Sequence, residues 1–227
     1  IPAKGASDSV LVVGAGPAGL EATRALAMRG YQVILAEART ELGGRVALER
    51  KLPGLSAWGR VADYREYQLS QMEKVDIYLD NELSATDILE FGMQHVLLAT
   101  GARWRRDAIA RRHVVAIPDD NSVAVYTPDD LRSGTQVSGK VVIYDDDHYY
   151  MGGVIAELLV LQGASVTLIT PAAYVSEWTG NTLEQATIHS KLVGLGVDIV
   201  LNRGIEKIEK GQIVNTCVYS GQEQRMD

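Results

Sequence analysis

The chain has 227 residues, of which 46% are hydrophobic and 22% are charged, and its net charge is −7 at pH 7. This length accommodates two domains, and the negative charge disfavours a nucleic-acid partner. The sequence contains no long apolar run and no signal-peptide pattern, so we expect a cytoplasmic protein without a membrane span. Cys217 is the single cysteine, which excludes an internal disulfide and a cysteine-ligated cluster.

The stretch 8–38 predicts a nucleotide-binding unit of strand, turn, helix and strand. An apolar run at 10–13 indicates a buried strand, and 14–19 read GAGPAG, a G-x-G-x-x-G pattern. A helix is expected from about 17 to 29 and a second strand at 31–36. In such a unit the three glycines allow a tight turn, close approach of a pyrophosphate, and close packing of helix on sheet. The phosphates would lie at the helix N-terminus.

Two further features follow the second predicted strand. Glu37 stands at its end, 18 residues after Gly19, where it can accept hydrogen bonds from an adenosine ribose and repel a 2′-phosphate. Gly43 and Gly44 can bring backbone under the distal part of a long dinucleotide. A plain glycine loop with a surface glutamate is the alternative interpretation.

The composition of 117–140 is that of a connector, rich in Asp, Pro, Ser and Gly. We therefore divide the chain into domains at 8–132 and 133–227, and the second could be incomplete. The arginines at 102–112 are interpreted as a solvated loop.

The stretch 141–170 repeats the strand-loop-helix-strand rhythm, but its loop lacks the usual glycines. Residues 145–147 are three aspartates and 149–150 are two tyrosines. Two unit charges about 4 Å apart interact by roughly 1 kcal/mol in water and about 4 kcal/mol near a protein surface. Charge repulsion and side-chain bulk both oppose a dinucleotide, so we predict that this second nucleotide site is lost. Rescue by a bound Mg²⁺ is the alternative.

The remainder, 181–227, predicts a helix followed by a meander of strands. His189 and Cys217 are expected to pack in these elements, and neither a Ser-His-Asp set nor a metal-ligand spacing stands out. We predict no catalytic and no metal-binding residue in the chain.

Three pieces of the sequence resemble the glutathione-reductase-like flavoproteins with two dinucleotide-binding domains: VVGAGPAGLEA (12–22), EARTELGGR (37–45) and VLLATGAR (96–103). The stretch 52–74 and the string ATGARW narrow the resemblance. They are similar to the C-terminal part of the trimethylamine and dimethylamine dehydrogenase group, which includes NADH:flavin oxidoreductases and 2,4-dienoyl-CoA reductase. In 52–74 we expect an amphipathic helix with Tyr64 and Leu69 inward.

The resemblance implies an α/β fold of two Rossmann-like domains that forms a piece of a longer oxidoreductase. The parent would carry an N-terminal TIM barrel with FMN and a 4Fe-4S cluster, and an electron-transfer flavoprotein is a candidate acceptor. In this chain we expect ADP or FAD, and not NAD. The cofactor-binding residues expected from pattern and resemblance together are Gly14, Gly16, Pro17, Ala18, Gly19, Glu37, Ala38, Arg39, Gly43, Gly44, Arg45, Ala99, Thr100 and Gly101.

Three functions remain open at this stage. The leading one is an adenine-nucleotide-binding portion of an iron–sulfur flavoenzyme of the amine dehydrogenase type, inactive on its own. The second is an NADH-dependent flavin reductase with FAD in the first domain and NAD(P)H in the second. The third is a non-catalytic module in which the nucleotide is structural or the domain receives an electron acceptor.

Overall fold

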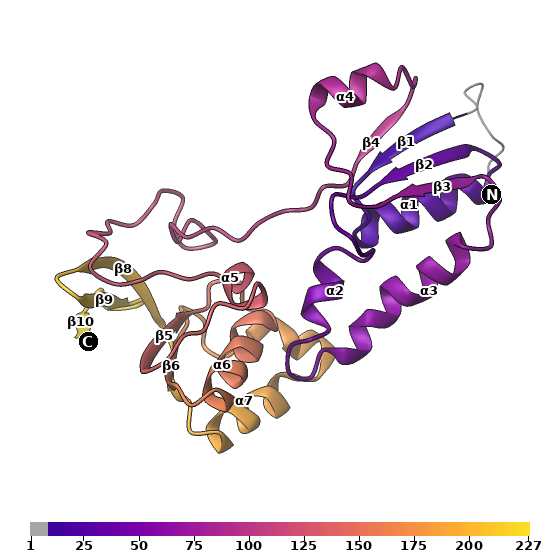
Figure 1. Cartoon of the computed structure of the whole chain (residues 1–227). Coiled ribbons are helices and arrows are strands. Elements are labelled where there is room, and N and C mark those ends of the chain that lie inside the picture. Colours follow the sequence, from indigo (N-terminus) through magenta and orange to yellow (C-terminus); the bar gives the residue numbers. More distant parts are fainter. Residues whose placement is uncertain (1–8) are drawn as a thin grey trace. The chain divides into compact units, whose positions relative to one another are not determined.

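The computed structural model describes residues 9–227, which form two compact units that divide between Ala102 and Arg103 (Figure 1). No helix in this described part is both long and apolar enough to cross a membrane. The backbone groups 103–132 with the second unit, whereas composition placed the domain division after residue 132. A connector-like composition indicates irregular structure, but it does not indicate that the segment lacks contacts with a domain. In this chain Arg112 pairs with Glu206, and Asp120 accepts a hydrogen bond from the Lys210 amide.

The first unit is a parallel four-stranded sheet in the order β3-β2-β1-β4 with helices connecting its strands. Its strands are β1 (Ser9–Val13), β2 (Gln32–Ala36), β3 (Val75–Tyr78) and β4 (Val96–Leu98). Its helices are α1 (Pro17–Met28), α2 (Arg45–Glu49), the 3₁₀ turn η1 (Ser56–Gly59), α3 (Arg60–Leu69) and α4 (Ala85–Glu90). The strands and helices predicted within 10–36 are confirmed to within a residue or two.

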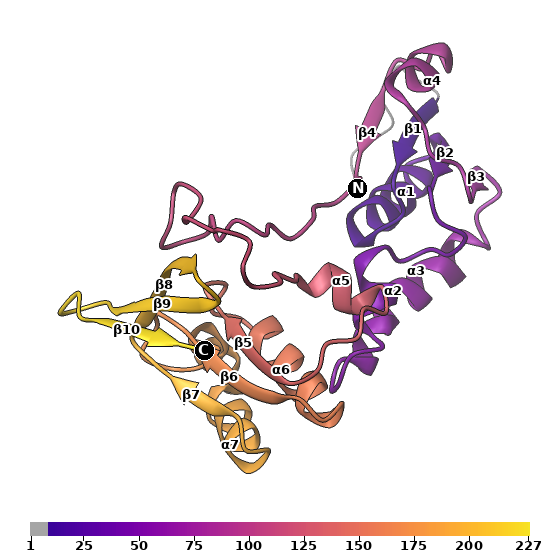
Figure 2. The same cartoon turned by 60° about the vertical axis from the view of Figure 1, so that its left-hand side comes forward.

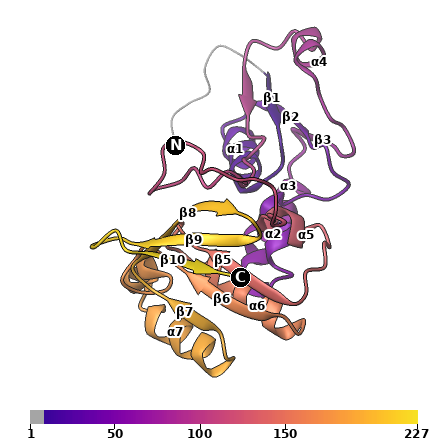
Figure 3. The same cartoon turned by 90° about the vertical axis from the view of Figure 1, so that its left-hand side faces the viewer.

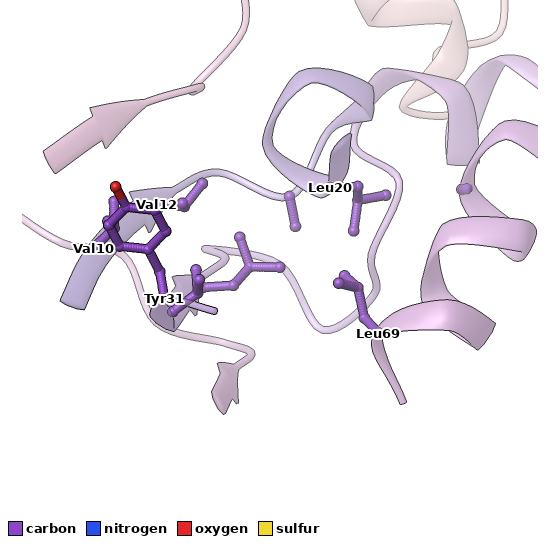
Figure 4. Close-up of a cluster of buried hydrophobic side chains, with 9 residues drawn as sticks. Val10, Val12, Leu20, Tyr31 and Leu69 are labelled. Atoms are coloured by element: carbon purple, nitrogen blue, oxygen red, sulfur yellow. The ribbon is translucent and has the colours of Figure 1, made fainter. Parts of the chain in front are cut away.

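The core of the first unit lies between the central strands and the helices α1 and α3. Val10 and Val12 of β1 pack with Leu20 of α1, Tyr31 before β2 and Leu69 of α3 (Figure 4). A buried central strand needs apolar residues on both faces, which is why 10–13 read as an unbroken apolar run. The core therefore fixes the carboxyl end of β1, where the glycine loop begins.

In helix α3, the predicted burial of one residue is confirmed and that of the other is wrong. Leu69 is buried at 2% exposure, as predicted, whereas Tyr64 is 57% exposed and faces solvent. Ala62 is the second fully packed residue of this helix, at 4% exposure. Ala62 and Leu69 are the buried residues of this helix, and Tyr64 takes no part in the core.

The second unit contains a parallel three-stranded sheet with helices and an antiparallel three-stranded sheet (Figure 2). The first sheet has the order β5-β6-β7, from β5 (Lys140–Tyr144), β6 (Ser165–Ile169) and β7 (Asp198–Val200). The helices are α5 (Pro128–Arg132), α6 (Met151–Leu161), the 3₁₀ turn η2 (Glu177–Thr182) and α7 (Gln185–Gly194). The predicted strand-loop-helix-strand at 141–170 is confirmed.

The predicted meander after α7 is partly wrong. Strand β7 pairs in parallel with β6 and so completes the first sheet of this unit. The antiparallel pairing begins only with β8 (Arg203–Glu209), β9 (Gln212–Cys217) and β10 (Glu223–Met226), which lie side by side in Figure 3. The run DIV is only three residues long, and sequence pattern alone did not separate it from the strands that follow.

Candidate functional site

The loop 14–19 connects the end of β1 to helix α1, and two of its glycines are required by close packing. Gly14 has φ +98°, and a Cβ there would lie 2.5 Å from the carbonyl oxygen of Ala99. A Cβ on Gly19 would lie 1.8 Å from the carbonyl oxygen of Gly14. The Gly14 amide donates to the Ala36 carbonyl at 2.7 Å, so the turn is also tied to β2. The loop is thus a tight turn closed by the end of β4.

Gly16 differs from these glycines because a Cβ there would meet nothing within 4 Å. It is the N-cap of α1, and its carbonyl accepts the hydrogen bond from Leu20 at 2.9 Å. The amides of Ala18 and Gly19 precede the first intrahelical hydrogen bond, so they have no carbonyl of the helix to donate to. Pro17 has no amide hydrogen. An open position beside unpaired amides at a helix N-terminus is suited to an anion.

A second glycine pair lies against the first loop. A Cβ on Gly44 would come within 2.8 Å of the Gly16 Cα. The Gly43 amide donates to the Ala15 carbonyl at 2.8 Å, and Gly43 has φ +102°. Gly44 is therefore required for the two backbone segments to run in contact, and Gly43 is required by its positive φ and by the side chains of Ala62 and Ala47 beside it.

Glu37 is a structural part of the glycine loop. Its side chain is 7% exposed, its Oε2 accepts from the Ala15 amide at 2.6 Å and its Oε1 accepts from the Arg39 amide at 3.0 Å. Each carboxylate oxygen has two lone pairs, so both can accept a further hydroxyl group. The pattern predicted a ribose acceptor but not this support of the loop. Ala38 and Arg39 follow as exposed residues.

The carboxyl end of β4 borders the same loop. The Ala99 amide donates to the Val13 carbonyl at 2.7 Å, and Gly101 turns the chain with φ +77°. Thr100 lies between them and is exposed. The strand end expected at 99–101 and the loop 14–19 are thus brought together, although they are far apart in sequence.

Arg45 reaches from α2 to the chain that follows β4. One guanidinium nitrogen, Nη2, donates to the Ala102 carbonyl at 3.2 Å, and Nε lies 3.7 Å from Oε1 of Glu49. Glu49 is 1% exposed, whereas Arg45 is 38% exposed. Sequence reasoning missed Glu49, and the signal available for it was its spacing of four residues from Arg45.

The corresponding loop of the second unit is filled by its own side chains. Asp145 is 3% exposed, and its Oδ1 accepts from the amides of Asp147 and His148 at 3.2 Å and 3.1 Å. A Cβ on Gly152, in the first turn of α6, would lie 2.7 Å from the Asp145 carboxylate. Burial raises the pKa of Asp145 to about 6. This carboxylate therefore lies against the first turn of α6.

Asp146 and His148 tie the same loop to its surroundings. His148 Nε2 lies 3.3 Å from Asp146 Oδ1, and Asp146 Oδ2 accepts from the Arg112 amide at 2.8 Å. Burial works against ionisation of Asp146, but the contacts with His148 and with the Arg112 amide bring its pKa below the usual range. Contact with Asp146 raises the pKa of His148. Asp145 and Asp146 are both buried, at 3% and 5% exposure.

We predicted no catalytic and no metal-binding residue. The second unit nevertheless contains one row of three polar side chains that has to be considered as a catalytic arrangement. Thr170 Oγ1 lies 3.4 Å from His148 Nδ1, so Thr170, His148 and Asp146 stand in a row. Thr170 is fully buried, which prevents a substrate from reaching its hydroxyl group. Within 9–227, no three His, Cys, Asp or Glu side chains are grouped as metal ligands.

Comparison with known proteins matches two families along the chain. Residues 8–144 match pyridine nucleotide-disulphide oxidoreductase, and 126–226 match the OYE-like second alpha/beta domain. Dimethylamine dehydrogenase from Hyphomicrobium sp. is 35% identical over 218 residues, which is 92% of this chain and 30% of that protein.

Two solved structures are similar over the whole chain. Histamine dehydrogenase from Rhizobium sp. 4-9 has 58% identity and a TM-score of 0.96 over 100% of this chain and 35% of its own. A 6-hydroxypseudooxynicotine amine oxidase from Pseudomonas geniculata N1 has 44% identity and a TM-score of 0.93, covering 100% and 34%. The chain thus spans about a third of the length of these relatives. From the match over 8–144, the chain belongs to the pyridine nucleotide-disulphide oxidoreductase family, and its relatives place it in the trimethylamine dehydrogenase group of flavin-dependent oxidoreductases.

Proposed function

We propose that this chain is the adenine-nucleotide-binding portion of an iron–sulfur flavoprotein oxidoreductase of the amine dehydrogenase type. The loop 14–19 binds the diphosphate of ADP or of the ADP half of FAD. The observation that carries the proposal is the open position at Gly16, flanked by two glycines that close packing requires.

The residues of the first unit fit such a nucleotide. Amides at the N-terminus of α1 meet the diphosphate, with Gly16 leaving room for it. Glu37 holds the Ala15 amide in place and offers its remaining lone pairs to the ribose hydroxyl groups. Ala38, Arg39, Thr100 and Gly101 line the approach. FAD, if it is the nucleotide bound, supplies a flavin that accepts and passes on electrons, whereas ADP supplies no redox chemistry.

The second unit keeps its fold without binding NAD(P)H. The Asp145 carboxylate lies against Gly152 at the N-terminus of α6, where it replaces the phosphate and repels any that approaches. The fold persists because the strands and helix around the loop still bury an apolar core, with Ile155 and Leu168 at 5% and 0% exposure.

The parent enzyme contributes the chemistry that this chain lacks. By analogy with relatives about three times as long, it carries a TIM barrel with FMN and a 4Fe-4S cluster, and it passes electrons to an electron-transfer flavoprotein. The chain alone is then catalytically inactive.

The test is the identity and stoichiometry of the nucleotide in the freshly purified chain. Protein is denatured, and the released nucleotide is analysed by mass; stripped protein is then titrated with ADP, FAD and NADH. ADP or FAD at about one per chain, with no NADH binding, is the expected result. A chain that saturates with NADH but with neither ADP nor FAD contradicts the proposal and favours the NADH-dependent reductase.

A structural role for the nucleotide is the second candidate. It is favoured by Glu37, which is buried and hydrogen-bonded to the loop before any ligand is considered. In that case ADP raises the thermal stability of the parent, and a Glu37→Ala variant loses this stabilisation while turnover by the barrel is unchanged. A collapse of turnover with unchanged stability would exclude this candidate.

A further inference from the structure

The diphosphate-binding loop itself contains no positive charge. Residues 14–19 read GAGPAG, so their attraction for an anion comes from backbone amides and the helix dipole, equivalent to about half a unit charge. The side chain that binds Ala15, Glu37, is acidic. A nearby cation would therefore strengthen the binding of a diphosphate at this loop.

Arg45 is placed to be that cation. It directly follows Gly44, whose backbone lies against Gly16. Its guanidinium group reaches Ala102, three residues beyond Ala99, whose carbonyl closes the turn at Gly14. Arg45 thus links the segment that contacts Gly16 to the segment that follows the contact with Gly14.

Glu49 restricts the conformation of the Arg45 side chain. An arginine side chain carries about 2 kcal/mol of rotamer entropy, which a ligand contact would otherwise have to overcome. Glu49 is 1% exposed on the last residue of α2, and its Oε1 lies 3.7 Å from Nε, while Ala102 accepts from Nη2. The buried carboxylate of Glu49 lies within ion-pair distance of Nε, and the Ala102 carbonyl accepts a hydrogen bond from Nη2, so the guanidinium group is held at two of its nitrogens.

We infer that Glu49 is a positioning residue that preorganises Arg45 for the nucleotide diphosphate. This inference rests on the proposed function, since it assumes that 14–19 bind ADP or FAD. Arg45 contributes the charge, and Glu49 acts on the nucleotide through Arg45. Preorganisation of one long side chain changes affinity by about 3- to 10-fold, and a charged hydrogen bond by about 10- to 100-fold.

The test is the affinity of the stripped 227-residue chain for ADP, measured by calorimetry in a double-mutant cycle of Glu49→Gln and Arg45→Gln. We expect Glu49→Gln to weaken ADP binding by about 3- to 10-fold in the wild-type background and to have no effect in the Arg45→Gln background. A merely structural role of Glu49 would lower affinity in both backgrounds.

Arg45→Lys is the second variant, since Arg45 is 38% exposed and tolerates replacement even if Glu49→Gln fails to fold. A lysine keeps the charge but cannot contact both Glu49 and Ala102 in this way, so it is expected to weaken ADP binding by about 3-fold or more. The matched control is Arg50→Gln, which removes an arginine of the same 38% exposure that pairs with Asp63; its ADP affinity stays at the wild-type value.

The failures of the two proposals are distinguishable. A wild-type chain that binds neither ADP nor FAD overturns the proposed function and this inference with it. Normal ADP binding by the wild type, with unchanged or tighter binding by Glu49→Gln or unchanged binding by Arg45→Lys, overturns this inference alone.

Discussion

At the scale of single residues, the glycines of 14–19 have different physical roles. Gly14 and Gly19 are needed for the chain to fold, because a Cβ on either would overlap backbone atoms. Gly16 is not needed for folding, since its neighbourhood is open and its φ of −70° suits any residue. Stability and binding can therefore be separated by substitutions three residues apart.

Gly16→Ser is expected to weaken ADP binding by at least about 10-fold without destabilising the free chain. Serine is a favourable N-cap and can add a few tenths of a kcal/mol of helix stability over glycine, but its side chain occupies the phosphate position and competes for the amides of α1. The measurements are calorimetric affinity and thermal unfolding of stripped protein. Unchanged affinity would place the ligand elsewhere.

Gly19→Ala is the control with the opposite outcome. The added Cβ would lie 1.8 Å from the Gly14 carbonyl oxygen, so the free chain is expected to lose about 1–3 kcal/mol of unfolding free energy or more. Chemical denaturation of the free chain measures this loss. Wild-type stability would show that the loop is looser than this contact indicates.

Glu37→Ala is expected to destabilise the free first unit by about 1–3 kcal/mol, because it leaves the buried amide of Ala15 without its acceptor. Glu37→Gln keeps one acceptor oxygen and is expected to cost less. Chemical denaturation without nucleotide compares the two. Equal stability of all three proteins would mean that Glu37 serves the ribose alone.

At the scale of elements, the loop before α6 makes stability depend on pH. The pKa of Asp145 is about 6 in the folded chain and about 3.9 in an unfolded one. The folded state binds this proton more tightly, so stability falls as the pH rises from about 4 to about 6. The pKa of His148 is also raised, so this residue adds to the stability of the fold below about pH 6.5. That stabilisation is lost as the pH rises through the pKa of His148 in the folded chain. The pKa of Asp146 is lowered, so this residue adds to the stability of the fold above about pH 4, and that stabilisation is lost as the pH falls further.

Asp145→Asn is therefore expected to stabilise the second unit by about 1–3 kcal/mol at pH 8 and to have little effect at pH 4. Asparagine keeps the acceptor for the amides of Asp147 and His148 and removes the buried charge. Denaturation curves at the two pH values, followed by amide exchange in α6, measure the difference. An equal effect at both pH values would contradict a buried ionised carboxylate.

At the scale of the whole molecule, sequence pattern predicted the elements better than the contacts. The run at 10–13 and the glycine spacing at 14–19 predicted β1, its turn and α1, because a buried strand and a tight turn leave few residue choices. The resemblance supplied 99–101, which no local pattern brings to the loop. The burial of Tyr64 and the pairing of strand β7 were predicted wrongly, since the exposure of a side chain and the parallel pairing of a strand depend on residues distant in the sequence.

The loop at 145–150 shows a similar limit. Its composition predicted a lost nucleotide site, but it did not show that Asp145 turns inward onto Gly152. A sequence gives the charge of a side chain and not its direction, and here the direction decides whether acids line a site or fill it. Glu49 escaped notice for the same reason, because an acid in a short helix is ordinarily solvated.

The central claim is that one nucleotide binds the chain, at 14–19, and that the equivalent loop at 145–150 is closed. Amide hydrogen exchange of stripped protein with and without saturating ADP, and with and without NADH, tests it most directly. The account predicts that ADP protects 14–20 and 43–45 and leaves 145–153 unchanged, and that NADH protects neither loop. Protection of 145–153 by NADH, with 14–20 exchanging as in the free chain, would contradict it.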